Sequence, residues 1–542
     1  MLDKYYMKEK IEVVNRIILF IVLIMLCIIP IITHIHTSTQ YSPIYTLTMY
    51  STGRKVELFN FYKAMVLYIG TFIVFVLSMY KIIFLKEEFK RKKINIILFI
   101  LAIGVILSPI FSKYKDIALF GNFDRYEGAL SWFCYIVIFF TLYNIKIEEK
   151  YFKYFYFGLF PFLIINLFLV LANFYGFDVL KNSFVQFILG SRNGGTFTGT
   201  FWTTLYQFNF MSGISAVTYS MSFVYMLFEE EHIKKILALL GTIISFTIVV
   251  TSNSLGGFLT SLVLTPIIIV LAWRFIKKKE LTIYTSIMLV LNGAVYLLLS
   301  MYKKSIYDET FAIFAKLNSI SVIIIPMILV LFIGIIFVLK YVNNKKFFDY
   351  STILFVAIVS ISTIVFSYTL NKEKQILSEN PSTNISSIKD SHIFNKLNEL
   401  STDRLNIWSR ALQFINENPV IGNGFDTFPY RLINEDKSGA VSKYGEIIDK
   451  THSWYVEVAY GSGLVGLIGL VGIIISLLRN TFYKYVDQVN DKFTYIFAAA
   501  VLAYALQGIL NDSFVGTSLI FWVFAGLSAN KIFFEKNENN TK

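Results

Sequence analysis

Residues 454–478 read WYVEVAYGSGLVGLIGLVGIIISLL, and residues 351–370 read STILFVAIVSISTIVFSYTL. Each apolar run is long enough to cross a bilayer as a helix, because about twenty helical residues span roughly 30 Å. Between the two runs lie residues 371–453, the one long polar stretch of an otherwise apolar chain. A membrane protein rarely keeps such a loop without a use, so we expect function to reside in this segment.

Apolar and polar segments alternate along the rest of the chain as well. Of its 542 residues, 56% are hydrophobic, 17% are aromatic and only 16% are charged. This is the composition of an integral membrane protein. Cys27 and Cys134 both fall within apolar runs, which indicates packing residues and not a disulfide or a metal pair.

The apolar runs predict an all-α polytopic membrane protein with about 14 transmembrane helices and one long extracytoplasmic loop containing an amphipathic helix. We expect a transmembrane bundle of about 11 helices at 1–370, an extracytoplasmic catalytic loop at 371–453, and about three further transmembrane helices at 454–542. The first run lacks a small-residue cleavage site and is expected to remain as an anchor. The runs lie near 17–34, 62–85, 94–111, 129–145, 154–173, 206–228, 236–251, 257–275, 281–300, 321–340, 351–370, 454–478, 493–510 and 517–534.

Lysine and arginine concentrate in alternate loops between these runs, and positively charged loops face the cytoplasm. Both termini are therefore expected in the cytoplasm of a multi-pass plasma-membrane protein, with segment 371–453 outside. These clusters also account for the net charge of +13, so nucleic acid binding is not expected. The clusters fall within 4–16, 86–93, 146–153, 234–235, 274–279, 340–346, 479–492 and 531–542.

Within the polar segment, an amphipathic helix is expected from an N-cap at Ser401 or Thr402 to about Asn416, with Pro419 marking its stop. One face of this helix carries an arginine followed by apolar surface. The apolar part of the face can dock while the arginine stays available. The residues of this face are Arg404, Trp408, Ala411 and Ile415.

Arg404 can bind a diphosphate through two parallel hydrogen bonds, and Arg125 or Arg410 could share that task. The alternative is a surface arginine that pairs with Asp403 or a lipid headgroup. Gly422 and Gly424 allow backbone amides to approach a phosphate or sugar closely. A plain turn after Pro419 explains these glycines equally well.

His452 closes the polar segment just before the run that begins at Trp454. An imidazole there can act as a base near neutral pH. Alternatively, a histidine beside Trp and Tyr belongs to the aromatic belt at a membrane surface. Glu457 lies one turn into the span, where a carboxylate is costly in lipid, so we expect it to face a polar cavity or the protein interior.

A fixed order of short elements is spread over most of the chain. The elements are Arg125-Tyr126-Glu127-Gly128, Gly199-Thr200-Phe201, then Arg404, Trp408, Pro419, Gly422, Gly424, Phe428 and His452, followed by the glycine-rich run 461–469. In this order they resemble the O-antigen ligase and polymerase superfamily, which are lipid-linked glycan transferases of the GT-C class. Two positions depart from the family pattern. Ser254-Leu255-Gly256 stands where many members have Ser-Arg-Gly, and Ser453 follows the histidine where asparagine is usual.

The resemblance implies transfer of a glycan from an undecaprenyl diphosphate carrier to an acceptor hydroxyl on the extracytoplasmic face, with inversion at the anomeric carbon. His452 would take the proton of the attacking hydroxyl, and Arg404 would stabilise the departing diphosphate. Because no Asp-x-Asp pair occurs in the outward loops, we expect a metal-independent reaction without a cofactor. The acceptor would be a glycan or a cell-wall hydroxyl. The residues expected to contact substrate are Arg125, Glu127, Trp408, Arg410, Gly422, Gly424 and Glu457.

A different class of protein remains as an alternative. Flippases and polysaccharide transporters of lipid-linked oligosaccharides also have about fourteen spans. However, such a transporter would line its central cavity with several basic residues, and the spans of this chain are nearly free of charge. Within the enzyme class, the related peptidoglycan polymerases fit the long loop with its Pro-x-x-Gly-x-Gly element less well.

Overall fold

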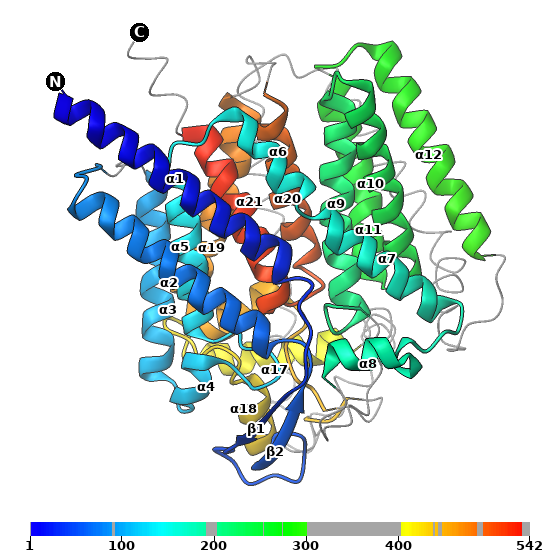
Figure 1. Ribbon diagram of the computed structural model, residues 1–542. Coiled ribbons are helices and arrows are strands. Elements are labelled where there is room, and N and C mark those ends of the chain that lie inside the picture. Colours follow the sequence, from blue (N-terminus) through cyan, green and yellow to red (C-terminus); the bar gives the residue numbers. More distant parts are fainter. Residues whose placement is uncertain are drawn as a thin grey trace, which may run out of the picture.

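The computed structural model describes residues 2–88, 93–190, 203–252, 254–273, 275–300, 403–436, 440–442, 447–484 and 491–533. The described chain is a helical bundle with one two-stranded sheet (Figure 1). The first group of bundle helices comprises α1 (Leu2–Ile28), α2 (Phe61–Ile83), α3 (Lys93–Phe111), α5 (Ala129–Asn144), α6 (Glu149–Phe157) and α7 (Phe160–Phe174). The second group comprises α9 (Phe208–Phe228), α10 (His232–Thr251), α11 (Leu255–Trp273), α12 (Lys278–Ser300), α19 (Trp454–Lys484), α20 (Lys492–Gln507) and α21 (Val515–Phe533).

These helices identify a multi-pass membrane protein. Within the described residues, nine helical stretches are long and apolar enough to cross a membrane, and the shorter helices α5, α11 and α20 are apolar too. They coincide with the expected runs, which confirms the predominantly helical architecture. The expected runs at 321–340 and 351–370 lie outside the described residues, so the total of about 14 stays a prediction.

Burial separates central helices from peripheral ones. Helices α9 and α21 are buried over their whole apolar windows, and they pack against α10, α20, α11 and α5. On the peripheral helices, large apolar side chains point outward, as Phe72, Phe99 and Phe168 do. Helices that are apolar all round belong in the centre of a bundle, whereas outward apolar faces suit contact with lipid.

The short elements gather at one end of the bundle, which we call the hairpin end (Figure 1). They are β1 (His36–Gln40), β2 (Gly53–Glu57), α4 (Lys115–Phe120), η1 (Val179–Lys181), α8 (Ser183–Leu189), α17 (Arg404–Glu417) and α18 (Phe428–Glu435). Strands β1 and β2 form an antiparallel hairpin in which His36 lies opposite Glu57. Helix α17 matches the expected amphipathic helix, and Ala411 and Ile415 on its apolar face are buried.

The start of α17 differs from expectation. The N-cap is Asp403, in a left-handed conformation with φ of 68°, and not Ser401 or Thr402, which lie outside the described residues. The Asp403 carboxylate accepts a hydrogen bond from Asn406 Nδ2 at 2.7 Å. It therefore fixes the first turn through a side chain and not through the backbone amides that a Ser or Thr cap would satisfy.

The glycine-rich segment after Pro419 packs into a break in α19 at Gly463, whose φ is 66°. The amides of Asn423 and Gly424 donate to the carbonyls of Tyr460 (2.7 Å) and Gly461 (3.0 Å). The Leu464 amide returns a bond to Pro419 O at 2.8 Å. A side chain at Gly422 or Gly463 would overlap backbone atoms of the opposing segment, so both positions require glycine.

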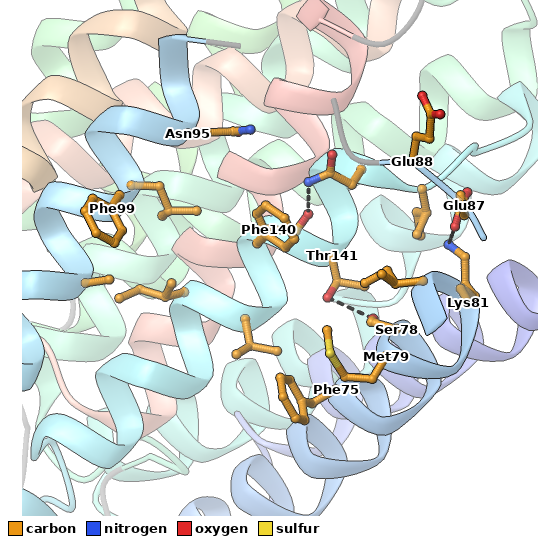
Figure 2. Close-up of a pocket in the computed structure, with 17 residues that line it drawn as sticks. Phe75, Ser78, Met79, Lys81, Glu87, Glu88, Asn95, Phe99, Phe140 and Thr141 are labelled. Carbon is orange, nitrogen blue, oxygen red and sulfur yellow. Dashed lines mark hydrogen bonds and ion pairs between the residues drawn. The ribbon is translucent and has the colours of Figure 1, made fainter. Parts of the chain in front are cut away.

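A cavity of about 300 Å³ lies between α2, α3 and α5 (Figure 2). Its walls are mainly apolar, and the buried Lys81 pairs with Glu87 at 2.6 Å near its edge. The cavity adjoins the C-terminal half of α5, whereas the hairpin end adjoins the N-terminus of the same helix. It is therefore remote from the charged groups described next.

Candidate functional site

The loop that precedes α5 is held in place by Asp426. One carboxylate oxygen, Oδ2, accepts hydrogen bonds from the amides of Asn122 and Glu127, both at 3.0 Å. The other oxygen, Oδ1, forms an ion pair with Lys450 Nζ at 2.9 Å. Asp426 and Lys450 are both buried, so this pair ties the loop to the end of the polar segment.

Arg125 projects from this loop into the interior and is only 3% exposed. Its guanidinium pairs with Asp449 and lies 3.6 Å from Asp512 Oδ2. The Phe210 ring lies beneath it, with the guanidinium carbon 5.5 Å from the ring centroid. Arg125 thus connects the polar segment, the turn between α20 and α21, and the start of α9.

His452 lies beside the same carboxylates. Its Nε2 is 3.8 Å from Asp449 Oδ1. The pKa of His452 is lowered to about 4, chiefly by burial; Asp512 opposes this shift, and the cations Arg404, Arg125 and Lys450 add to it. The ring is therefore neutral at physiological pH. Its side chain keeps 32% of its surface exposed, so a substrate can reach one side of it.

Helix α17 brings Arg404 to this group. Trp408, one turn after Arg404, donates a hydrogen bond from Nε1 to Thr451 O at 2.8 Å, next to His452. Burial lowers the pKa of Arg404, while Asp512 raises it. Positions 404 and 452 therefore lie at the same end of the bundle, and Asp512 raises the pKa of both side chains.

Two glutamates lie beneath the charged cluster. Glu127 accepts hydrogen bonds from Tyr135 Oη (2.9 Å) and Ser518 Oγ (2.5 Å), and burial raises the pKa of Glu127 to about 7. Glu457 Oε2 accepts from Thr451 Oγ1 at 3.0 Å. Both side chains are buried, as expected for Glu457 in the protein interior.

The remaining predicted residues lie apart from this cluster or serve packing. Arg410 pairs with Asp436 and is not among the groups around His452. The amides of Gly422 and Gly424 already donate to Asn418 O and Gly461 O, so the geometry favours the turn and not phosphate binding. Gly199-Thr200-Phe201 lies outside the described residues.

Backbone strain is concentrated at the cluster. Apart from glycine, six described residues have positive φ. Five of the six are His452 itself and residues near Arg125, Arg404 or His452. Such conformations cost of order 1–3 kcal/mol each and persist where the surroundings hold them. The five residues are Tyr126 (54°), Tyr206 (69°), Asp403 (68°), Asp426 (57°) and His452 (53°).

Sequence reasoning missed Asp426, Asp449 and Lys450 as members of the site. Asp449 and Lys450 stand directly before Thr451-His452, so their closeness to His452 in the sequence could have indicated that they belong to the site. Asp426 gave none, because its partners are distant in sequence. Within the described residues, no group of three His, Cys, Asp or Glu side chains is placed to hold a metal ion.

One comparison with known proteins gave a match. Residues 310–471 match a protein-family model described as O-antigen ligase. The matched region includes α17, the Pro-x-x-Gly-x-Gly segment and His452. No curated protein matched the chain.

Proposed function

Because the match over residues 310–471 supports membership of this chain in the O-antigen ligase superfamily, as the sequence resemblance predicted, we propose that the protein is a membrane glycosyltransferase. It transfers a glycan from an undecaprenyl diphosphate carrier to an acceptor hydroxyl. The observation that carries this proposal is the convergence of Arg125, Arg404 and His452 at one end of a membrane-spanning bundle.

The hairpin end is the extracytoplasmic end in this proposal, and both termini are cytoplasmic. The distribution of lysine and arginine supports this orientation. Segment 371–453 is then the extracytoplasmic catalytic loop between the bundle at 1–370 and the helices at 454–542. The carrier's polyprenyl chain stays in the membrane while its diphosphate reaches Arg125 and Arg404.

In the transfer step, the acceptor oxygen forms a bond to the anomeric carbon as the bond from that carbon to the diphosphate oxygen breaks. The electron pair leaves with the diphosphate, whose growing charge Arg125 and Arg404 stabilise. His452 takes the acceptor proton. Asp449 favours the tautomer that carries its hydrogen on Nε2, which leaves Nδ1 free to act as the base.

In this proposal Asp449 orients the His452 ring, in place of the residue after the histidine, which is Ser453 here and usually asparagine in the family. In the structure Asp449 is shared, with one oxygen toward Arg125 and the other toward His452. An anionic diphosphate competes with Asp449 for Arg125. Donor binding therefore frees the Asp449 carboxylate to approach the His452 imidazole. His452 then has its orienting partner only when the donor is bound.

The experiment is reconstitution of the purified protein with a lipid-linked oligosaccharide. Replacement of His452 by alanine should reduce the rate of transfer by about 10²–10⁴ because the general base is lost. His232, an exposed histidine at the opposite end of the bundle, provides the matched control as His232→Ala. Unchanged transfer in His452→Ala would remove the proposed base. The length of the wild-type product distinguishes a ligase, which transfers once, from a polymerase.

A further inference from the structure

The tip of the β1–β2 hairpin has an inverted pattern of side chains. Between the strands, residues alternate between outward and inward positions as they do in an extended strand. The outward side chains are apolar and most of the inward ones carry hydroxyls, which is the reverse of the usual arrangement. The outward residues are Tyr41, Pro43, Tyr45, Leu47 and Met49.

This tip is rigid and not a loose loop. Its inward hydroxyls bond the backbone, with Thr46 Oγ1 accepting from the Thr48 amide at 3.2 Å and Thr48 Oγ1 accepting from the Tyr50 amide at 3.3 Å. Tyr50 is buried against Tyr430, with ring centroids 5.1 Å apart. Tyr45 and Leu47 are each 93% exposed on this fixed support. Exposed apolar side chains that the fold holds in place mark an interaction surface.

The tip is continuous with the transfer site. Tyr430, which contacts Tyr50, donates from its hydroxyl to Asn122 Oδ1 at 2.8 Å. Asn122 belongs to the loop that carries Arg125. The contacts of Tyr50, Tyr430 and Asn122 therefore connect the tip to the loop of the charged cluster.

The side chains of the tip indicate which kind of ligand it can bind. Residues 37–53 contain no Asp, Glu, Lys, Arg or His, and the outward residues of the tip are all uncharged. The cations Arg54 and Lys55 lie at its base, where Lys55 Nζ donates to Ser51 Oγ at 3.3 Å, so the outward face itself favours an uncharged ligand. The tip also lies beyond α17 and α18, at the far side from the bundle helices (Figure 1). Tyrosine rings beside aliphatic groups complement the C–H faces of sugar rings, with polar edges left for hydrogen bonds.

We propose that the outward face of the hairpin tip binds a neutral segment of the glycan that is being transferred or extended. This proposal rests on the proposed function, since it assumes that a glycan is present at the adjacent site. The tip holds the chain several sugars away from the reacting end. It therefore acts on affinity for the glycan and not on the chemical step.

The test uses the full-length protein in lipid nanodiscs. Its probe is the delipidated oligosaccharide that mild acid releases from the organism's own lipid-linked glycan, with binding followed by titration calorimetry. The double variant Tyr45→Ala with Leu47→Ala should weaken binding by about tenfold. Tyr45→Phe keeps the ring and should bind as the wild type does. Phe187→Ala removes a 64% exposed aromatic side chain from α8 at the same end and should have no effect.

Three results would overturn the proposal. The first is unchanged glycan binding in the double variant, and the second is no glycan binding by the wild type. The third is a double variant that binds the glycan normally but no longer binds lipid vesicles or a second copy of the protein. His452→Ala separates this proposal from the proposed function, because it should abolish transfer while the oligosaccharide still binds. Testing the free oligosaccharide and the lipid-linked donor in parallel shows which substrate the hairpin tip holds.

Discussion

Arg431 and Arg125 are both buried arginines at the hairpin end, but their nitrogen atoms are used differently. Arg431 donates from Nε to Glu435 Oε2 at 3.0 Å and from Nη1 to Asn423 Oδ1 at 2.5 Å, and Nη2 pairs with Glu417. Every nitrogen of its guanidinium therefore has a fixed partner. Such a group joins segments of the fold through three of its five N–H donors.

Arg125 shows the opposite arrangement. Its Nη1 and Nη2 make ion pairs with Asp512 and Asp449 but no hydrogen bond to the described residues. Nearby, Glu457 Oε1 is buried and likewise accepts no hydrogen bond. Buried polar groups without hydrogen bonds are uncommon and costly. Arg431 is thus held by hydrogen bonds, whereas Arg125 is held by ion pairs with two carboxylates, for which an anionic diphosphate would compete in the proposed mechanism.

The largest expected effect comes from replacing each arginine with glutamine. Arg125→Gln should lower the rate of transfer per folded molecule by about 10²–10³, because a donor to the transition state is lost. It should also lower the melting temperature, because Asp449 and Asp512 lose their cation. Arg431→Gln should lower the melting temperature too, but with a much smaller effect on the rate per folded molecule. Both quantities can be measured on the same preparations. Equal loss of transfer in both variants would abolish the distinction.

A smaller effect should appear in the pH dependence of stability. Burial raises the pKa of Glu127 from 4.5 to about 7, so the folded state holds this proton more tightly than the unfolded state does. The contribution of Glu127 to stability should therefore be highest below about pH 4.5, fall as the pH rises to about 7, and then level off, by roughly 3 kcal/mol in all. His452, whose pKa is lowered from 6.5 to about 4, contributes with the opposite sign over much of this range, so the wild type and the variant must be compared at each pH.

Glu127→Gln should remove part of this slope. Burial also raises the pKa of Glu57 to about 7, so a second contribution of the same sign remains in the variant. Melting temperatures of the wild type and the variant, measured between pH 4 and pH 8, test this expectation. A slope that is identical in the two proteins would show that Glu127 does not hold a proton beneath the Arg125 cluster.

The smallest expected effect concerns the pKa of His452, which is about 4. Arg404 lowers this pKa and Asp512 raises it, so Arg404→Gln should move it upward and Asp512→Asn downward, each by roughly half a unit to one unit. Arg431→Gln should leave it unchanged. Histidine resonances followed by NMR during a pH titration measure the shift. A response to Arg431→Gln equal to that of Arg404→Gln would contradict the separation of the two regions.

The helices and the polar segment could be predicted because their signals are local. Apolar runs of sufficient length gave α2, α3 and α19 nearly to their ends, and helical spacing gave α17 with Ala411 on its buried face. Arg404 and His452 were found because each stands at a boundary of a recognisable segment. The structure places them around one carboxylate, and their roles in transfer remain a proposal.

What the sequence does not reveal depends on contacts between distant segments. Asp426 binds backbone amides at Asn122 and Glu127, about three hundred positions earlier, which no local pattern indicates. The use of Gly422 against Gly463 is hidden for the same reason. The hairpin was missed because its strands are short and polar, so they lack the alternating apolar residues that mark a strand.

The backbone bonds between residues 418–425 and the broken helix α19 have a practical consequence. The membrane helix supplies carbonyls to the loop, and the loop supplies carbonyls to the helix, so each completes the other's backbone hydrogen bonding. A water-soluble fragment cut at Ser453 would leave these groups without partners and would not keep its native shape. Ligand screening and antibody selection against this protein accordingly require the intact, membrane-embedded chain.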